Sequence, residues 1–367
     1  GKIEFDMYGG NITGSIYGGA RMATTRDKNI PGQPDVNILN LYGGQITGNI
    51  FGHGDSDSSV GNSIINLSGC VNLTGNIFGG SNTTTEAQGK VTGNTTININ
   101  SSITVDGNIY GGSNGVINGT TINTNTGLIT GDTNITLNVG TIKGDIYGGG
   151  NNCGETGNAN ININNGQVTG NIYGGAYQNQ VQTSTNINIL GGTVQNIYGG
   201  NILTTQTQQN ADTASENTTI VIGSKDATTI PTINGTIYGS GKYDRIGTVE
   251  IQLVKSATLS TIYGGSDGAG ITSEVNIYLK GITANTIYGG SKNDGIVTMS
   301  NIYLETGTVT DIYGGGYGGS TVTSNIILEG NANITNIYGG SNSNGSVGTS
   351  NIDLKSGKLT NIYGGGN

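Results

Sequence analysis

Short runs of alternating apolar and polar positions follow one another along the whole chain, and each run ends in Ile-Tyr-Gly or Ile-Phe-Gly. In SNIYLETGTVTDIYGGG, Ile302 and Leu304 stand at alternate positions, and Val309 and Ile312 follow after a glycine. Alternation with period two, carried largely by β-branched residues, is typical of β-strands whose two faces meet different environments. The pattern therefore predicts short strands with these apolar side chains turned inward.

The runs recur at a nearly fixed spacing. The aromatic residue of each Ile-aromatic-Gly motif marks the phase, and these residues are Tyr17, Phe51, Phe78, Tyr110, Tyr147, Tyr173, Tyr198, Tyr238, Tyr263, Tyr288, Tyr313, Tyr338 and Tyr363. The last five steps are each 25 residues, and the earlier steps run from 25 to 40. A period in the twenties indicates an array in which every unit packs on its neighbours.

Each period contains enough apolar positions for three short strands. A third apolar site precedes each alternating run, at Ile246, Ile271, Val297, Val322 and Val347. Three strands separated by Gly or Asn turns make one coil of a parallel β-solenoid, and coils stacked about 4.8 Å apart bury their inward side chains. We predict an all-β, single-domain parallel β-solenoid over residues 1–367, with about 13 coils of about 25 residues. The general preference of parallel crossovers favours a right-handed coil.

The Gly-Gly pair after each aromatic residue predicts a corner. Glycine permits backbone conformations closed to other residues, and a side chain at this corner would also strike the next coil. The asparagine that often precedes the Ile predicts a ladder of side-chain amides between coils. Extra residues fall after the corner, in 20–35, 81–93, 113–132 and 201–217. Inserts gathered at one corner form a candidate binding face.

The repeats carry a resemblance to a known group of proteins. Asp311-Ile312-Tyr313-Gly314-Gly315-Gly316 and its twelve counterparts resemble the Gly-rich NIYGG-repeat parallel β-helix segments of bacterial cell-surface and adhesin-like proteins. The resemblance spans essentially the whole chain. It implies a parallel β-helix, an extracellular or cell-surface location in a bacterium, and an adhesive or structural role, and it leads us to expect a segment of a longer repeat protein.

Composition narrows the possible partners. Hydrophobic residues make up 32% of the chain, which suits only a narrow core. The formal net charge of -9 argues against nucleic acid, which requires clustered Lys and Arg. No apolar run reaches the roughly 18 residues of a membrane span. Glycans and host or bacterial surface proteins remain as expected partners, together with end-to-end self-association through open β-edges.

Two carboxylates give the strongest argument for an enzyme. Glu305 and Glu329 occupy equivalent places on adjacent coils, at a separation of roughly 5 Å that would suit a retaining glycosidase. Lys280 and Lys355 hold the same place on the flanking coils, so a ladder of ion pairs explains the same residues. We therefore expect no enzyme. A polysaccharide lyase or hydrolase on this fold remains an alternative, and an end-to-end fibre subunit without a ligand remains another.

The aromatic residues are the candidate binding residues. Alternation places the motif rings outward and stacked along one edge, where exposed rings would suit sugars or a flat protein surface. Rings packed on one another could equally seal the corner and fix the register of the coils. The candidates are Tyr313, Tyr338 and Tyr363 in the column, with Tyr278 and Tyr303 forming a separate small patch.

Metal and thiol chemistry have weaker support. Asp55 and Asp57 stand at alternating positions in GDSDSSVGNS, like oxygen ligands of a calcium loop, but the glycine and final glutamate of an EF-hand are missing. We expect no cofactor and keep calcium as a candidate. His53 is the only histidine, so a zinc site is not expected. Cys70 and Cys153 do not make a disulfide framework.

Overall fold

The computed structural model of the chain describes residues 1–21, 35–56, 61–83, 89–116, 127–153, 157–179, 181, 183–203, 217–226, 229–255 and 258–367. Its contacts divide the chain into two compact units, Gly1–Thr185 and Asn186–Asn367, and each is described by itself. Both units are built from parallel strands, which confirms the predicted all-β parallel β-solenoid. Among the described residues, no helix is long and apolar enough to cross a membrane.

The strands lie in chain order as follows: β1 (Lys2–Met7), β2 (Asn11–Ile12), β3 (Ile16–Tyr17), β4 (Val36–Ile46), β5 (Ile50–Phe51), β6 (Asn62–Leu73), β7 (Ile77–Phe78), β8 (Thr95–Ile99), β9 (Thr104–Val105), β10 (Ile109–Tyr110), β11 (Thr133–Leu137), β12 (Thr141–Ile142), β13 (Ile146–Tyr147), β14 (Ala159–Ile163), β15 (Gln167–Val168), β16 (Ile172–Tyr173), β17 (Ser184–Ile189), β18 (Thr193–Val194), β19 (Ile197–Tyr198), β20 (Asn217–Ile222), β21 (Thr232–Ile233), β22 (Thr236–Tyr238), β23 (Arg245–Leu253), β24 (Leu259–Tyr263), β25 (Ile271–Tyr288), β26 (Ile296–Tyr313), β27 (Ser320–Tyr338), β28 (Val347–Leu354) and β29 (Lys358–Tyr363).

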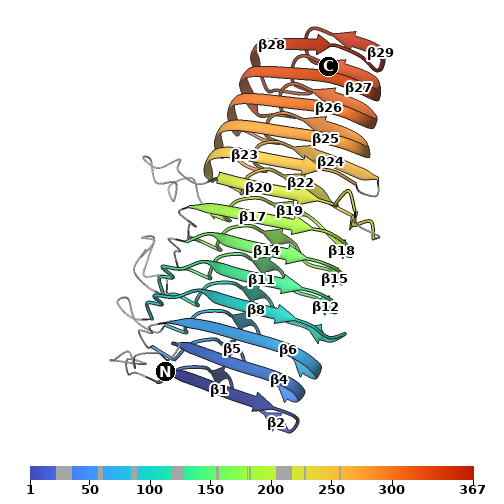
Figure 1. Cartoon of the computed structure of the whole chain (residues 1–367). Coiled ribbons are helices and arrows are strands. Elements are labelled where there is room, and N and C mark those ends of the chain that lie inside the picture. The colour runs from blue at the N-terminus through green and yellow to red at the C-terminus, as the bar shows by residue number, and fades with distance from the viewer. Residues whose placement is uncertain are drawn as a thin grey trace. The chain divides into compact units, whose positions relative to one another are not determined.

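The first unit stacks its coils through three rows of parallel pairs. The longest strand of each coil forms the row β1-β4-β6-β8-β11-β14. The short strand that follows forms a second row. This row contains the pair β2-β4 at the start of the unit and the series β6-β9-β12-β15 further along the chain. The Ile-aromatic pair forms β3-β5-β7-β10-β13-β16. Figure 1 shows these strands as successive layers along the unit.

In the second unit the strands of a coil merge. β25, β26 and β27 each run from the start of the coil to its tyrosine as one bent strand, and each pairs in parallel with the next (Figure 1). Register shifts after Leu279 and Leu304 mark the bend in these strands. Because three coils share this continuous register, side chains at equivalent positions form straight columns on the outer face.

The core follows the predicted alternation. Ile302, Leu304, Val309 and Ile312 expose 1% or less of their surface. The inward residues predicted from the same pattern elsewhere are also buried, and they are Ile135, Leu137, Ile142, Ile146, Ile161, Ile163, Val168 and Ile172. A single file of Ile, Leu and Val per strand, repeated from coil to coil, explains how a chain so poor in apolar residues still buries a core.

In two coils the third apolar site of the predicted pattern lies one residue away from the residue that points into the core. Val322 is 53% exposed, and the preceding residue, Thr321, is buried instead. Ile271 is half-buried, and the following residue, Thr272, is buried. The register explains this result, since Thr272, Val297 and Thr321 lie opposite one another in the sheet. Both threonines fill an inward position that the hydrophobic pattern alone could not assign to a polar residue.

Close approach of the backbone requires glycine at the corner. A Cβ added to Gly79 would lie 2.2 Å from the carbonyl oxygen of Gly111, and one added to Gly111 would lie 2.1 Å from that of Gly148. The predicted clash with the next coil is thus confirmed. The predicted need for a special conformation was wrong, because the described corner glycines do not have the positive φ of a left-handed residue. That conformation occurs instead in the turn before the second strand, for example at Gly140 (φ 112°).

The motif aromatics stack from coil to coil, as predicted. Neighbouring ring centroids are 4.8 Å apart between Phe78 and Tyr110 and 4.5 Å apart between Tyr313 and Tyr338. The prediction that these rings are exposed was wrong for most of them, because Tyr110 and Tyr147 are buried, as are their counterparts Tyr173, Tyr238, Tyr263, Tyr288 and Tyr313. The column therefore acts mainly as a second, aromatic core at the corner.

In several coils the residue four positions after the ring packs against the column. Tyr317 packs edge-on against Tyr288, with centroids 6.4 Å apart, and Asn342 donates a hydrogen bond of 2.8 Å to the Tyr288 hydroxyl. In the first unit the same position carries an amide ladder, in which Asn114 donates to Asn82 and Asn151 donates to Asn114, each over 2.8 Å. The contacts of Tyr317 and Asn342 contribute to the burial of the Tyr288 ring.

The predicted amide ladder at the residue before the Ile is also present. Asn336 donates to Asp311 and Asn361 donates to Asn336, each over 2.8 Å. In the first unit the side-chain oxygen of Asn49 accepts instead from the backbone N–H of Asn76. Of the predicted inserts 20–35, 81–93, 113–132 and 201–217, the segments 22–34, 84–88, 117–126 and 204–216 lie outside the described residues.

Candidate functional site

The outer face of β23, β25 and β26 holds a pair of tyrosines, of which Tyr278 is exposed and Tyr303 is half-buried. Tyr278 on β25 lies in register with Tyr303 on β26, and the rings stack with centroids 4.9 Å apart at an interplanar angle of 8°. Both side chains point outward because they alternate with the buried Ile277, Leu279, Ile302 and Leu304. This separate patch was predicted from the sequence, and the structure brings its two rings together.

The tyrosine pair lies in a cleft of about 430 Å³. Glu250, Gln252, Val254, Lys280, Glu305 and Glu329 form its polar and apolar walls beside the two rings. Val254 lines the cleft at the end of β23, and Lys280 and Glu305 line it from the next coils. The sequence analysis did not single out Glu250, Gln252 or Val254.

Tyr278 ends the aromatic pair on the β23 side. Its register partner there is Gln252, so no third ring covers that side, and Tyr278 is 40% exposed. The Gln252 amide donates a hydrogen bond to the Glu250 carboxylate. This contact ties the Gln252 side chain to the neighbouring column of the outer face.

The hydroxyl of Tyr278 stays protonated near neutral pH. Burial raises its pKa above the ordinary value, and the charges of Tyr303, Glu250 and Glu274 raise it further. A protonated phenol can donate a hydrogen bond to an oxygen or accept one from a hydroxyl. The cleft therefore presents aromatic rings, a hydroxyl, an amide and carboxylates within one surface.

A ladder of asparagines runs beside the cleft. Asn301 donates to Asn276 over 2.9 Å, Asn325 donates to Asn301 over 2.7 Å, and Asn351 donates to Asn325 over 2.8 Å. Each amide is held at both ends by its neighbours, so the ladder fixes the side chains of the outer face. The strands that carry the two tyrosines are thus cross-linked by side-chain amides beside the cleft.

The two carboxylates considered for catalysis are both ion-paired. Lys280 lies 2.9 Å from Glu305, and Lys355 lies 2.7 Å from Glu329. The predicted Lys-Glu-Glu-Lys ladder is confirmed by these pairs. All four side chains are about half exposed, so the pairs contribute little to stability, but they hold the carboxylates along one wall of the cleft.

The three candidate tyrosines of the motif column differ in exposure. Tyr313 is 3% exposed and cannot present a ring face to a ligand. Tyr338 is half-buried, and Tyr363 on β29 is 46% exposed. All three belong to one continuous stack, separate from the Tyr278–Tyr303 cleft.

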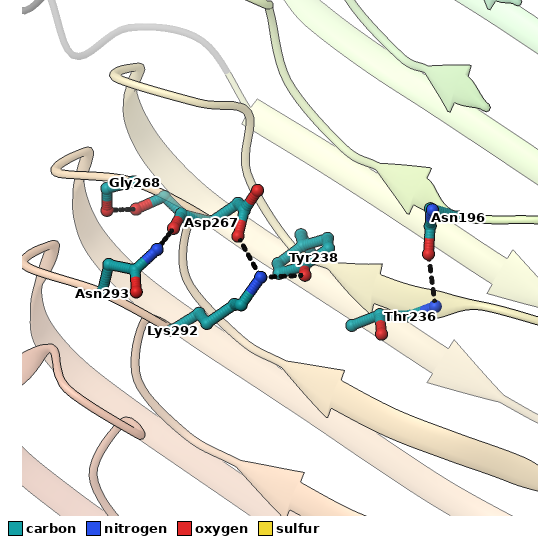
Figure 2. Close-up of polar contacts among 8 residues, drawn as sticks. Asn196, Thr236, Tyr238, Asp267, Gly268, Lys292 and Asn293 are labelled. Atoms are coloured by element: carbon teal, nitrogen blue, oxygen red, sulfur yellow. Dashed lines mark hydrogen bonds and ion pairs between the residues drawn. The ribbon is translucent and has the colours of Figure 1, made fainter. Parts of the chain in front are cut away.

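A second polar cluster lies where the loops cover the ring column. Figure 2 shows the Lys292 ammonium between the Asp267 carboxylate, at 2.8 Å, and the Tyr238 hydroxyl, at 3.2 Å. The hydrogen bond to Asp267 raises the pKa of Lys292, and burial raises the pKa of Tyr238. Both groups keep their protons at neutral pH, so neither is a base or a nucleophile.

The same view shows how this cluster joins successive coils. Asn293 donates to the backbone carbonyl of Asp267, and the Asn196 side chain accepts from the backbone N–H of Thr236 over 2.8 Å (Figure 2). These bonds link loops of adjacent coils. We interpret the cluster as a tie that closes the corner.

The calcium candidate is only partly described. The Asp55 carboxylate lies 3.6 Å from the guanidinium of Arg21 and accepts a hydrogen bond of 2.8 Å from Asn82, whereas Asp57 lies outside the described residues. No group of three or more His, Cys, Asp or Glu side chains within the described part of the chain could hold a metal ion. Cys70 and Cys153 are not joined in a disulfide, and the Cys153 thiol donates a hydrogen bond of 2.9 Å to the Ser113 carbonyl oxygen.

Comparison of the chain with protein-family models, with curated proteins and with solved structures gave no match. The functional argument therefore depends on the geometry of the cleft and on the repeat itself.

Proposed function

We propose that this chain is a non-enzymatic, adhesive β-solenoid of a bacterial cell surface, and that it binds glycans through the cleft at Tyr278 and Tyr303. The observation that supports this most strongly is the stacked tyrosine pair in a polar cleft, with the exposed ring of Tyr278 at its open end. Sugar rings offer C–H faces that pack on aromatic rings and hydroxyls that pair with amides and carboxylates. The cleft offers both kinds of partner.

The cross-linked strands support a binding role. The tyrosines stand on long paired strands, and the amide ladder beside them fixes the neighbouring side chains. A site that is formed before the ligand arrives loses little entropy on binding. Stacked coils also add length, which suits a shaft that carries a binding face away from a cell.

The polar groups of the cleft favour binding over catalysis. Glu305 and Glu329 are each paired with a lysine, so both carboxylates are engaged by a cation rather than free to act on a glycosidic bond. Lys292 of the corner cluster is protonated, so it is not a candidate general base either. A polysaccharide lyase or hydrolase is the second candidate, because Glu305 and Glu329 line the same cleft as the tyrosines.

A glycan and polysaccharide panel tests the proposal. We expect the purified chain to retain at least one glycan, and the double variant Tyr278→Ala/Tyr303→Ala to lose at least about tenfold in affinity, since each ring contributes about 1 kcal/mol or more. Met299→Ala is the matched control, because Met299 is exposed on the same face of β26 but does not line the cleft. Unchanged binding by a folded double variant would refute this site.

A further inference from the structure

The cleft carries an excess of negative charge. Three carboxylates, of Glu250, Glu305 and Glu329, line it together with one ammonium, of Lys280. Lys280 is paired with Glu305, and Glu329 is paired with Lys355. A ligand that enters the cleft therefore meets a net negative potential around two aromatic rings.

Glu250 is the carboxylate with capacity for a new cation. It accepts a hydrogen bond from the neutral Gln252 amide, and it forms no ion pair with the Lys or Arg residues that the structure describes. The negative charge of Glu250 raises the pKa of the Tyr278 hydroxyl, as does that of Glu274, so both carboxylates lie close to this ring. A cation placed here would neutralise a charge that no neighbouring group balances.

Tyr278 adds an aromatic contribution at the same point. Its ring is exposed and ends the stacked pair on the side of β23, which is the strand that carries Glu250. An ammonium within about 6 Å of an aromatic centroid is attracted to the ring face. A carboxylate beside an open ring therefore makes a subsite suited to a protonated amine.

The form of the cleft favours an amine on a sugar over a lysine on a peptide. Because the two rings are stacked face to face, the pair offers one open ring face, that of Tyr278 towards Gln252, with carboxylate oxygens beside it. A pyranose ring can stack on this face and offer hydroxyls to Gln252 and the carboxylates, whereas a lysine side chain would bring only its ammonium to the ring and the charge.

We infer that the Tyr278–Tyr303 cleft selects polysaccharides that carry free, protonated amino groups, namely de-N-acetylated hexosamine chains, with the amine at Glu250 and the sugar ring on Tyr278. This inference depends on the proposed glycan-binding function and specifies its ligand class.

Titration calorimetry with three probes tests the inference. The probes are a hexamer of β-1,4-linked glucosamine, the same hexamer fully N-acetylated, and a tetralysine peptide, all at mildly acidic pH. We expect the free-amine hexamer to bind at least about tenfold more tightly than the acetylated one, and added salt to weaken the binding of the free-amine hexamer.

We expect Glu250→Gln, which keeps an acceptor for Gln252, to remove most of this difference in affinity. Asp353→Asn is the matched control, because it removes an exposed carboxylate of β28 that does not line the cleft.

Each other outcome overturns a defined part of the proposal. Equal or tighter binding of the acetylated hexamer would refute the amine preference and leave glycan binding intact. Tighter binding of tetralysine than of the glucosamine hexamer would refute the sugar ligand and indicate a basic protein partner. Loss of the amine preference in Asp353→Asn but not in Glu250→Gln would refute the assigned subsite. If neither hexamer binds and the panel retains no glycan, the inference and the proposed function both fail.

Discussion

A single methyl group at a corner glycine should destabilise the fold strongly, and Gly111→Ala is the sharpest case. The added Cβ would lie 2.1 Å from the Gly148 carbonyl oxygen, a contact that must lengthen by about 1 Å to become tolerable. The backbone hydrogen bonds from Gly111 to Tyr147, at 2.9 Å, and from Gly112 to Gly149, at 3.2 Å, join the same two coils. Moving the coils apart by that amount breaks both bonds.

The expected magnitude follows from these two costs. Two lost hydrogen bonds cost about 0.5–1.5 kcal/mol each, and overpacking costs about 1–3 kcal/mol, so we expect a loss of about 2–6 kcal/mol in the free energy of unfolding. Gly9→Ala is the matched control, because a Cβ there meets nothing within 4 Å. It should change stability by less than about 1 kcal/mol.

Urea denaturation followed by far-ultraviolet circular dichroism measures both variants, and amide exchange locates the effect. We expect faster exchange at the corner amides of the coils that contain Gly111 and Gly148, because coil stability depends on neighbouring coils. Equal stabilities of Gly111→Ala and Gly9→Ala would show that the coils are not in the close contact described above.

Three further predictions concern the core, a buried acid and metal dependence. Ile135→Ala should lower the free energy of unfolding by about 2–5 kcal/mol, whereas Ile230→Ala, at a 49% exposed position, should change it by less than about 0.5 kcal/mol in the same urea titration. Burial raises the pKa of Asp244 to about 6, so its contribution is fully present below about pH 4 and is lost as the pH rises through about 6. The loss should be about 3 kcal/mol, and Asp244→Asn should flatten this pH dependence of stability; an unchanged pH profile would contradict the prediction. Because Asp55 is engaged by Arg21 and Asn82, a chelator should leave Tm unchanged, and a chelator-dependent fall in Tm would establish a calcium site.

The alternation of side chains made most of the fold predictable. Ile302 and Leu304 are buried because a strand turns every second residue to the same face, and this rule needs no tertiary information. The burial of Tyr288 could not be derived in this way, since loop residues such as Asn342 and Tyr317 fold back over its ring. Thr321 and Val322 were assigned to the wrong faces because hydrophobicity and register disagree at the start of the strand.

The candidate site was predictable only in pieces. Tyr278 and Tyr303 share a phase in the repeat, and so do Lys280 and Glu305, so the sequence indicated a tyrosine patch and a charge ladder separately. Their union in one cleft depends on Glu250, Gln252 and Val254 in the preceding coil. A careful alignment of VEIQLV with VNIYLK would have placed Glu250 and Gln252 beside Asn276 and Tyr278, as the observed register does.

The most direct test of the proposed function is whether a glycan that binds in the cleft is released without being cleaved. A polysaccharide retained by the chain is incubated with it for an extended period, and the supernatant is assayed for new reducing ends and for unsaturated sugar ends. Binding without catalysis predicts no released fragments and a polymer of unchanged size. Fragments that appear with the wild-type chain and disappear in Glu305→Gln or Glu329→Gln would contradict it and establish a polysaccharide-cleaving enzyme.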